Sequence, residues 1–248
     1  MVVEHFYTSD EYIKNNPDWH VDAAPWKANS VLEMIHRNHL TPTTIGEVGC
    51  GAGEILKILQ QHLSTECTFL GYDIAPQAIE LAKTRENEKL HFKLADFEQE
   101  QTSSFDLLLI VDVLEHFEDC FQFLRTIKTR SEYKLFQIPL DIFVLSVLRN
   151  ELIEFRHATG HLHFFTKDII LEVLQTSGYQ IRDIFYTLPP LEATPWKSVR
   201  KRPRKLAIKL LKMAKRGLQR LPGNIVYAFN QDLAVRIFGG WRLMVLAK

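Results

Sequence analysis

The sequence predicts an α/β protein built on a doubly wound, mainly parallel sheet. Three observations support this prediction. Runs rich in β-forming residues alternate with helical patterns from residue 44 onward. A glycine-rich turn follows the first of these runs, and an acidic residue stands at the end of each of the next three. Because parallel strands end at one edge of the sheet, we expect the turn and the acids to meet there.

The β-rich runs and the helical patterns can be placed along the chain. The expected strands are TIGEV (44–48), CTFLGYD (67–73), LHFKLAD (90–96), FDLLLIVDV (105–113), YKLFQIP (133–139), GYQIRDIFY (178–186) and WRLMVLAK (241–248). The expected helices are 22–38, 75–86, 118–130 and 166–178. In the last of these, Thr166 is expected to cap the start and Gly178 to end the helix.

The composition is that of a chain that can bury a full core as one domain. It has 248 residues, of which 46% are hydrophobic and 24% charged. The first residues, MVVEHFYTSDEY, lack the basic start and apolar run of a signal peptide, so we expect a cytoplasmic protein. Cys50, Cys67 and Cys120 fit neither a disulfide framework nor a zinc-ligand pattern.

A loop with three glycines follows the first expected strand, in EVGCGAGE. Gly49, Gly51 and Gly53 allow the backbone to approach a ligand closely. A dinucleotide-binding loop would have its third glycine at position 54, where this chain has Glu54, a poor neighbour for phosphate. The loop therefore indicates a nucleoside ligand without phosphates. Glu47, just before the loop, suits a ligand that carries an ammonium or sulfonium charge.

Acidic residues end the second, third and fourth expected strands. Asp73 is placed to accept hydrogen bonds from both hydroxyls of a ribose. Asp96 is placed to meet an adenine amino group, with Ile74 and Phe97 available to enclose the ring. Acids at strand ends also cap the helices that follow, so any one of them could be structural. Three in succession, with Asp112 as the third, favour a ligand site.

Four short motifs lie in order along the chain: E-V-G-C-G-A-G, G-Y-D, A-D-F and F-D-L-L-L-I-V-D-V-L-E-H-F. They resemble the first four motifs of the class I S-adenosylmethionine-dependent methyltransferases. The later G-H-L-H-F-F-T-K-D is similar to the segment after the fifth strand in the branch that methylates small molecules. The resemblance covers roughly residues 25–186. It implies a Rossmann-like seven-stranded sheet whose last strand, 241–248, runs antiparallel.

The resemblance also implies S-adenosylmethionine as the cofactor. The expected cofactor-binding residues are Glu47, Gly49, Cys50, Gly51 and Gly53 in the glycine loop, Asp73 for the ribose, Asp96 with Ile74 and Phe97 for the adenine, and Asp112 and Val113 beside the methyl sulfonium. The implied function is methyl transfer to oxygen or carbon of a small or lipid-linked acceptor. The alternative is a catalytically silent S-adenosylmethionine-binding protein that acts as a regulatory or membrane-surface partner.

The motif at the fourth strand makes a nucleic-acid base an unlikely acceptor. The strand continues into V-L-E-H, in place of the Asn/Asp-Pro-Pro-aromatic tetrapeptide of methylases that modify exocyclic base amines. Oxygen and carbon acceptors are therefore favoured.

Two histidines are candidate catalytic residues. His116 follows the fourth strand and His161 follows the fifth, and an imidazole suits a hydroxyl acceptor because it titrates near neutrality. His116 could instead orient or cap, and His161 could serve local structure. The spacing of His157, His161 and His163 could ligate a metal, but without Cys or an acid at ligand spacing we expect no metal.

The two flanking segments are expected to add to the core of residues 41–186. A helical cap over 1–40 brings Trp19, His20, Trp26 and Lys27 ahead of the first strand, where they could form a lid over the cofactor. Alternatively, the two tryptophans only pack the helix onto the body.

A basic helical insertion is expected in the segment 187–240, before the last strand. Eleven Lys or Arg and no acidic residue lie between 197 and 220, although the whole chain has 30 of each sign. Residues 204–221 form a basic amphipathic pattern. The helix could contact an anionic membrane, roof the acceptor pocket or bind a partner.

Overall fold

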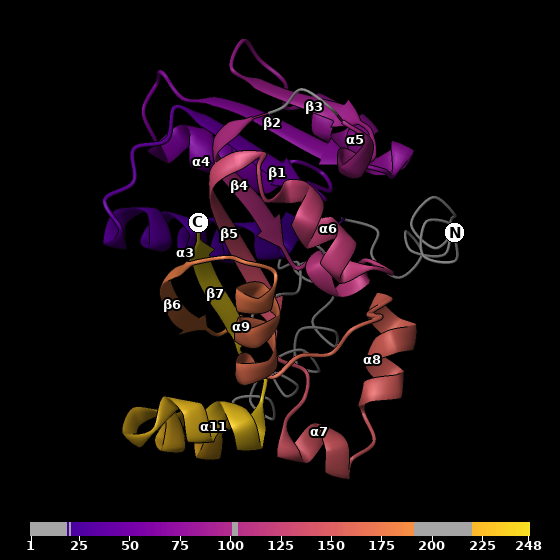
Figure 1. The fold of residues 1–248 in the computed structure, drawn as a ribbon, viewed down its shortest axis with the longest axis vertical. Coiled ribbons are helices and arrows are strands. Elements are labelled where there is room, and N and C mark those ends of the chain that lie inside the picture. Colours follow the sequence, from indigo (N-terminus) through magenta and orange to yellow (C-terminus); the bar gives the residue numbers. More distant parts are fainter. Residues whose placement is uncertain (1–18, 20, 101–103, 191–219) are drawn as a thin grey trace, which may run out of the picture.

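The computed structural model describes residue 19 and residues 21–100, 104–190 and 220–248. Its centre is a seven-stranded sheet with the strand order β3-β2-β1-β4-β5-β7-β6 (Figure 1). The strands are β1 (Thr44–Val48), β2 (Thr68–Asp73), β3 (Leu90–Leu94), β4 (Phe105–Val111), β5 (Ser131–Pro139), β6 (Ile181–Thr187) and β7 (Arg242–Ala247). β7 pairs antiparallel with both β5 and β6, whereas the other pairs are parallel. The predicted sheet, including its antiparallel last strand, is confirmed.

Helices cover both faces of the sheet. One hydrophobic cluster joins the sheet to α3 (Ala24–Arg37), α4 (Glu54–His62) and α5 (Pro76–Lys83). A second cluster joins the other face to α6 (Cys120–Ile127), α9 (Lys167–Thr176) and α11 (Gln231–Phe238). The short helices α7 (Val144–Leu148) and α8 (Leu152–Thr159) lie to one side of the sheet, beyond the end of β5 (Figure 1).

The central strand β4 shows why these residues form a covered parallel strand. Leu107 and Leu109 pack into the cluster with α3 and α4, while Leu108 and Ile110 pack into the cluster with α6 and α9. Successive side chains of a strand point to opposite faces, so a strand covered on both faces is apolar at nearly every position. The continuous apolar run in the sequence therefore reflects two-sided burial.

The strand order places a ligand crevice beside β1. The chain moves outward from β1 to β2 and β3, then returns to add β4 on the other side of β1. In doubly wound sheets, ligands bind beyond the carboxyl ends of the strands at such a reversal. The loop after β1 and the residues that follow β4 meet there.

Local signals also behave as expected. The Thr166 hydroxyl accepts a hydrogen bond from the Ile169 amide at 3.3 Å and so caps α9. Gly178 has a φ of 82° and follows the end of that helix. The predicted basic helix 204–221 lies outside the described residues except for residues 220 and 221, which begin a helical stretch over 220–229. Within the part of the chain that is described, no helix has the length and apolarity needed to cross a bilayer.

Candidate active site

A cavity of about 540 Å³ lies at the carboxyl edge of the sheet. Its wall is formed by the glycine loop, the residues after β2, β3 and β4, and Trp19 with part of α3. Nine of the predicted site residues line it: Gly49, Cys50, Gly51, Asp73, Ile74, Asp96, Phe97, Asp112 and Val113. His116 lines it as well. The sequence therefore placed most of its cofactor residues around one cavity.

The three glycines of the loop are required for different structural reasons. All three have positive φ values, 68° at Gly49, 53° at Gly51 and 76° at Gly53. A Cβ at Gly53 would lie 2.3 Å from a ring carbon of Phe92, and one at Gly49 would lie 2.6 Å from Val113. These two glycines are needed for packing, and Gly53 also starts α4. At Gly51 the nearest atom would be the Trp19 carbonyl oxygen at 3.7 Å, so this glycine keeps the wall of the cavity open.

Asp73 holds the glycine loop in place. Its carboxylate accepts hydrogen bonds from the Gly51 amide at 2.8 Å and from the Ala75 amide at 2.9 Å. Each carboxylate oxygen can accept a further hydrogen bond, so the group can still bind a ribose hydroxyl. Burial raises the pKa of Asp73, while the backbone hydrogen bonds oppose the rise.

The predicted adenine residues have structural partners too. The Asp96 carboxylate accepts hydrogen bonds from the Glu98 amide and the Gln99 side chain, both at 3.0 Å, and so caps the short helix η2 (Phe97–Gln99). Asp96 therefore has the helix-capping role that acids at strand ends commonly have. Phe97 is only 2% exposed, and its ring packs edge-on against Tyr72 at 4.9 Å between ring centres.

Glu47 lies behind the loop, outside the residues that line the cavity. It is 1% exposed, and no described residue hydrogen bonds to its Oε2 atom. Burial raises the pKa of this carboxyl to about 8; Lys27 acts against the rise and Asp73 adds to it. Burial likewise raises the pKa of the Cys50 thiol in the loop well above its ordinary value.

Asp112 has an unusual backbone and two basic neighbours. Its φ of 52° lies in the left-handed region, which is uncommon for residues other than glycine. Lys27 Nζ lies 2.9 Å from one carboxylate oxygen, and Arg242 Nε lies 3.5 Å from the other. Burial alone would raise the pKa of Asp112, but Lys27 and Arg242 outweigh it and hold the pKa at about 2. Asp112 is therefore a carboxylate at neutral pH.

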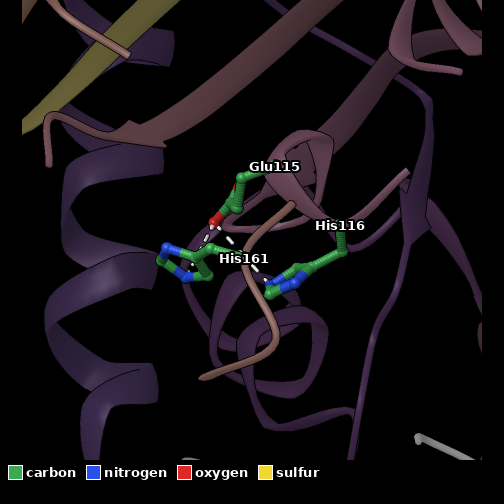
Figure 2. A group of neighbouring side chains, drawn as sticks. All are labelled: Glu115, His116 and His161. Carbon is green, nitrogen blue, oxygen red and sulfur yellow. Dashed lines mark ion pairs between the residues drawn. The ribbon is translucent and has the colours of Figure 1, made fainter. Parts of the chain in front are cut away.

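The candidate catalytic histidines are neighbours (Figure 2). Their ring centres are 5.0 Å apart. Burial, with a further contribution from the nearby His161, lowers the pKa of His116 to about 4. His116 Nδ1 lies 3.2 Å from the Gly160 carbonyl oxygen, and His161 Nδ1 lies 2.7 Å from Asp141 Oδ2. His161 is 8% exposed and does not line the cavity.

The three histidines of the later motif do not converge. His157 is exposed on α8, and His163 Nε2 donates a hydrogen bond to the Phe117 carbonyl oxygen at 2.8 Å. His161 instead meets His116 and Glu115. The three histidines therefore lie apart in the structure, and His161 instead contacts the segment that follows β4.

Comparison with known proteins adds sequence evidence to this geometry. Residues 47–130 match the family described as a methyltransferase domain. A curated malonyl-[acyl-carrier protein] O-methyltransferase from Acetivibrio thermocellus is 32% identical over 94 residues, which are 37% of this chain and 33% of that protein. Residues 47–130 contain the glycine loop and the residues that follow β2, β3 and β4. Residues 47–130 therefore belong to a methyltransferase domain, as the resemblance of the motifs to the class I S-adenosylmethionine-dependent methyltransferases implied.

Two solved structures agree with this assignment at the level of the fold. Magnesium protoporphyrin IX methyltransferase from Synechocystis PCC 6803, with bound SAH, has a TM-score of 0.58 at 17% identity, covering 75% of this chain and 92% of that chain. An S-adenosylmethionine-dependent methyltransferase from Archaeoglobus fulgidus has a TM-score of 0.53 at 15% identity, covering 89% and 94% of the two chains. The match with the curated relative spans only a third of that protein's length.

Segments before the first strand and at the last strand contribute residues to the site that the motifs did not indicate. Trp19 lines the cavity and is 9% exposed, and residues 1–18 and His20 lie outside the described structure. Trp26 Nε1 donates a hydrogen bond to Thr187 Oγ1 at 2.9 Å, so it ties α3 to β6. Arg242 reaches Asp112 from the start of the last strand.

Proposed function

We propose that this methyltransferase transfers a methyl group from S-adenosylmethionine to an oxygen or carbon atom of a small or lipid-linked acceptor. One observation carries the proposal. Nine of the residues assigned to the cofactor line one cavity together with the imidazole of His116. A cofactor and an acceptor could therefore meet there without a change of fold.

The residues of this chain fit that cofactor. When bound, S-adenosylmethionine supplies a methyl group already activated by its sulfonium. Asp73 would hold the ribose, and Gly51 leaves room for the backbone to approach the ligand. Glu47, buried and without a described hydrogen-bond partner at Oε2, would compensate a nearby positive charge. The main contribution of the protein would be to position two reactants, an effect that reaches roughly 7–11 kcal/mol in well-oriented systems.

At the acceptor side, we assign His116 to the reacting group, and His161 to the support of the His116 ring. The Nδ1–H of His116 donates to the Gly160 carbonyl, so in the neutral ring the lone pair is on Nε2. With its pKa lowered to about 4, His116 is neutral at pH 7 and suits hydrogen bonding better than holding a proton. His161, which pairs with Asp141, supports the His116 ring from behind.

The name of the curated relative supports one class of acceptor. Its name gives an O-methyltransferase that acts on a malonyl group attached to an acyl-carrier protein. This supports an oxygen acceptor, and an acceptor linked to a larger carrier, for the chain described here.

The test separates an enzyme from a silent binding protein. Calorimetry with S-adenosylhomocysteine should detect binding, and cell extract incubated with methyl-labelled S-adenosylmethionine should yield a labelled product. The His116→Gln variant should keep its affinity for S-adenosylhomocysteine and lose most product formation, whereas the matched variant His157→Gln should behave like the wild type. Binding without any labelled product would favour the regulatory alternative.

A further inference from the structure

Glu115, His116 and His161 form a compact group beside the cavity (Figure 2). Glu115 Oε1 lies 3.9 Å from His116 Nε2 and 3.8 Å from His161 Nε2. One ligand atom from each residue can be chosen so that all lie within 4.8 Å of one another. Glu115 and His116 belong to the short helix η3 (Leu114–His116), and His161 follows α8, so the chain topology brings the group together.

The hydrogen bonds of the two rings point their lone pairs toward the same carboxylate. The Gly160 carbonyl can only accept, so His116 Nδ1 must carry the proton. Asp141 fixes the Nδ1 proton of His161 in the same way, at 2.7 Å. In the neutral rings, both Nε2 atoms are therefore the unprotonated nitrogens, and both face Glu115.

Glu115 lacks the partners that a buried carboxyl requires. Its side chain is 0% exposed, and neither carboxyl oxygen hydrogen bonds to any residue in the described ranges. The distances of 3.8 and 3.9 Å to the imidazoles are too long for hydrogen bonds. A carboxyl buried without a partner is costly whether it is charged or neutral. A cation between the three atoms would remove this cost.

We propose that Glu115, His116 and His161 bind a divalent transition-metal ion through one carboxylate oxygen and two Nε2 atoms. Two ligands about 2.1 Å from a tetrahedral ion are about 3.4 Å apart, so each side chain needs to move by less than about 1 Å. Two imidazoles and a carboxylate suit zinc, iron or cobalt, whereas magnesium prefers oxygen ligands. Three protein ligands leave at least one position open, as in catalytic metal sites.

The framework of the site is rigid before any ion enters. The Glu115 carbonyl accepts hydrogen bonds from the Leu162 amide at 2.8 Å and from the His163 amide at 3.1 Å. These bonds, with the one between His116 and Gly160, fasten the loop of His161 to η3. Asp141 accepts a hydrogen bond from the far nitrogen of His161, as carboxylates commonly do when they orient a metal-bound imidazole. His116 lines the cavity, which gives an ion a route from solvent.

The position of the site suggests what the ion would do. It would lie at the acceptor end of the cavity, near Asp112 and Val113, and its open position could bind an acceptor oxygen. This part rests on the proposed function, whereas binding of the ion does not. It makes an oxygen acceptor, such as a hydroxyl or a carboxylate, more suitable than a carbon acceptor. The two histidines would then act as ligands in place of proton acceptors.

The test uses the full chain after removal of metals with a chelator. Titration with Co²⁺ should give visible absorption bands typical of nitrogen coordination and saturate at one ion per chain. Zn²⁺ should displace Co²⁺, and Mg²⁺ should not. Glu115→Gln and His161→Gln should weaken Co²⁺ binding by more than about 100-fold, and Asp141→Asn by about 10- to 100-fold. His157→Gln, an exposed histidine of the same motif, should bind as the wild type does.

Several outcomes would overturn the proposal. If Glu115→Gln binds Co²⁺ as tightly as the wild type, Glu115 is a structural acid. If the wild type and His157→Gln take up no Co²⁺, the group holds no metal. Should Glu115→Gln fail to fold, Asp141→Asn decides, since its carboxylate lies outside the ligand set. Azide should change the Co²⁺ spectrum by entering the open position; an unchanged spectrum would refute that position. Asp73→Ala should lose cofactor affinity and keep Co²⁺ binding, which separates this proposal from that of the function.

Discussion

Replacing Glu47 by Gln should change how the stability of the cofactor-free protein depends on pH. In the folded chain, burial raises the pKa of Glu47 to about 8, against an ordinary value of 4.5. Between these two values the folded state keeps the proton, whereas the unfolded chain releases it. The folded state therefore binds more protons, and its stability falls as pH rises through this window. Glutamine has nearly the shape of the protonated acid and does not titrate.

The size of the effect follows from the two pKa values. One pKa unit corresponds to about 1.4 kcal/mol, so the shift from 4.5 to about 8 gives an upper limit of about 5 kcal/mol. Relative to the wild type, Glu47→Gln should gain up to this amount in unfolding free energy between pH 4.5 and pH 8. The gain should level off above pH 8, where both states of the wild type are ionised.

Urea unfolding at a series of pH values measures this difference directly. Titrating groups that do not contact Glu47 contribute equally to the two proteins, so they cancel in the comparison. An unfolding free-energy difference between the wild type and Glu47→Gln that stays constant from pH 5 to pH 8 would refute the burial argument. In the wild type, S-adenosylmethionine binding should also tighten as pH rises, because a cationic ligand favours the carboxylate. Glu47→Gln should lose that dependence.

Three further substitutions test the packing and charges of the site. Asp73→Ala should weaken S-adenosylhomocysteine binding by about 2 kcal/mol or more in calorimetry, the scale of a hydrogen bond to a charged group; unchanged affinity would disprove the ribose assignment. Lys27→Met should lower the unfolding free energy by about 3 kcal/mol in urea, and adding Asp112→Asn should recover part of the loss if the ion pair is the cause. Gly53→Ala should destabilise the protein by about 2 kcal/mol or more, because a Cβ would lie 2.3 Å from Phe92 in a backbone with a φ of 76°. A melting temperature equal to that of the wild type would contradict the last expectation.

The fold could be predicted because two-sided burial leaves a clear pattern in the sequence. The apolar run of β4 is the clearest case, since both faces of the strand are covered. The predicted positions of the strand ends were less accurate than the predicted strands themselves. Strand β3 stops at Leu94 and β4 at Val111, each two residues before the predicted end. Asp96 and Asp112 lie past these ends, one capping η2 and the other with a positive φ.

Short helices without a strong apolar stripe were not predicted. Helix α8 has no fully buried residue, so its sequence lacks the periodic pattern that marks longer helices. One residue in the sequence could have marked the end of α8: Gly160, which follows the helix with a φ of 81°. The basic helix 204–221 remains a prediction, because the described residues cover only its last two positions. Its three alternative roles, as a roof over the acceptor pocket, a membrane contact or a partner site, remain open predictions too.

The residues around Asp112 show what a single sequence cannot supply. Lys27 comes from the helix before the sheet, and Arg242 from the last strand, yet both reach the same carboxylate. Their sequence separation hides this pairing, because nothing in local pattern specifies which helix packs beside which strand end. The sequence failed to indicate Glu115 for a different reason. It lies next to His116 in the sequence, but its importance depends on His161, which only the fold brings near.

Asp112 and Glu115 are three positions apart and have opposite environments. Lys27 and Arg242 keep Asp112 ionised, and this attraction helps to hold a backbone conformation that costs roughly 1 kcal/mol or more. Glu115 has no described hydrogen-bond donor, and burial with the nearby charge of Asp112 raises its pKa well above its ordinary value. Pairs of carboxyls whose environments push their pKa values apart commonly mark the working part of a site. Here the charged member lines the cavity, and the other lies against the two histidines. The acceptor chemistry is therefore best sought at Glu115, His116 and His161.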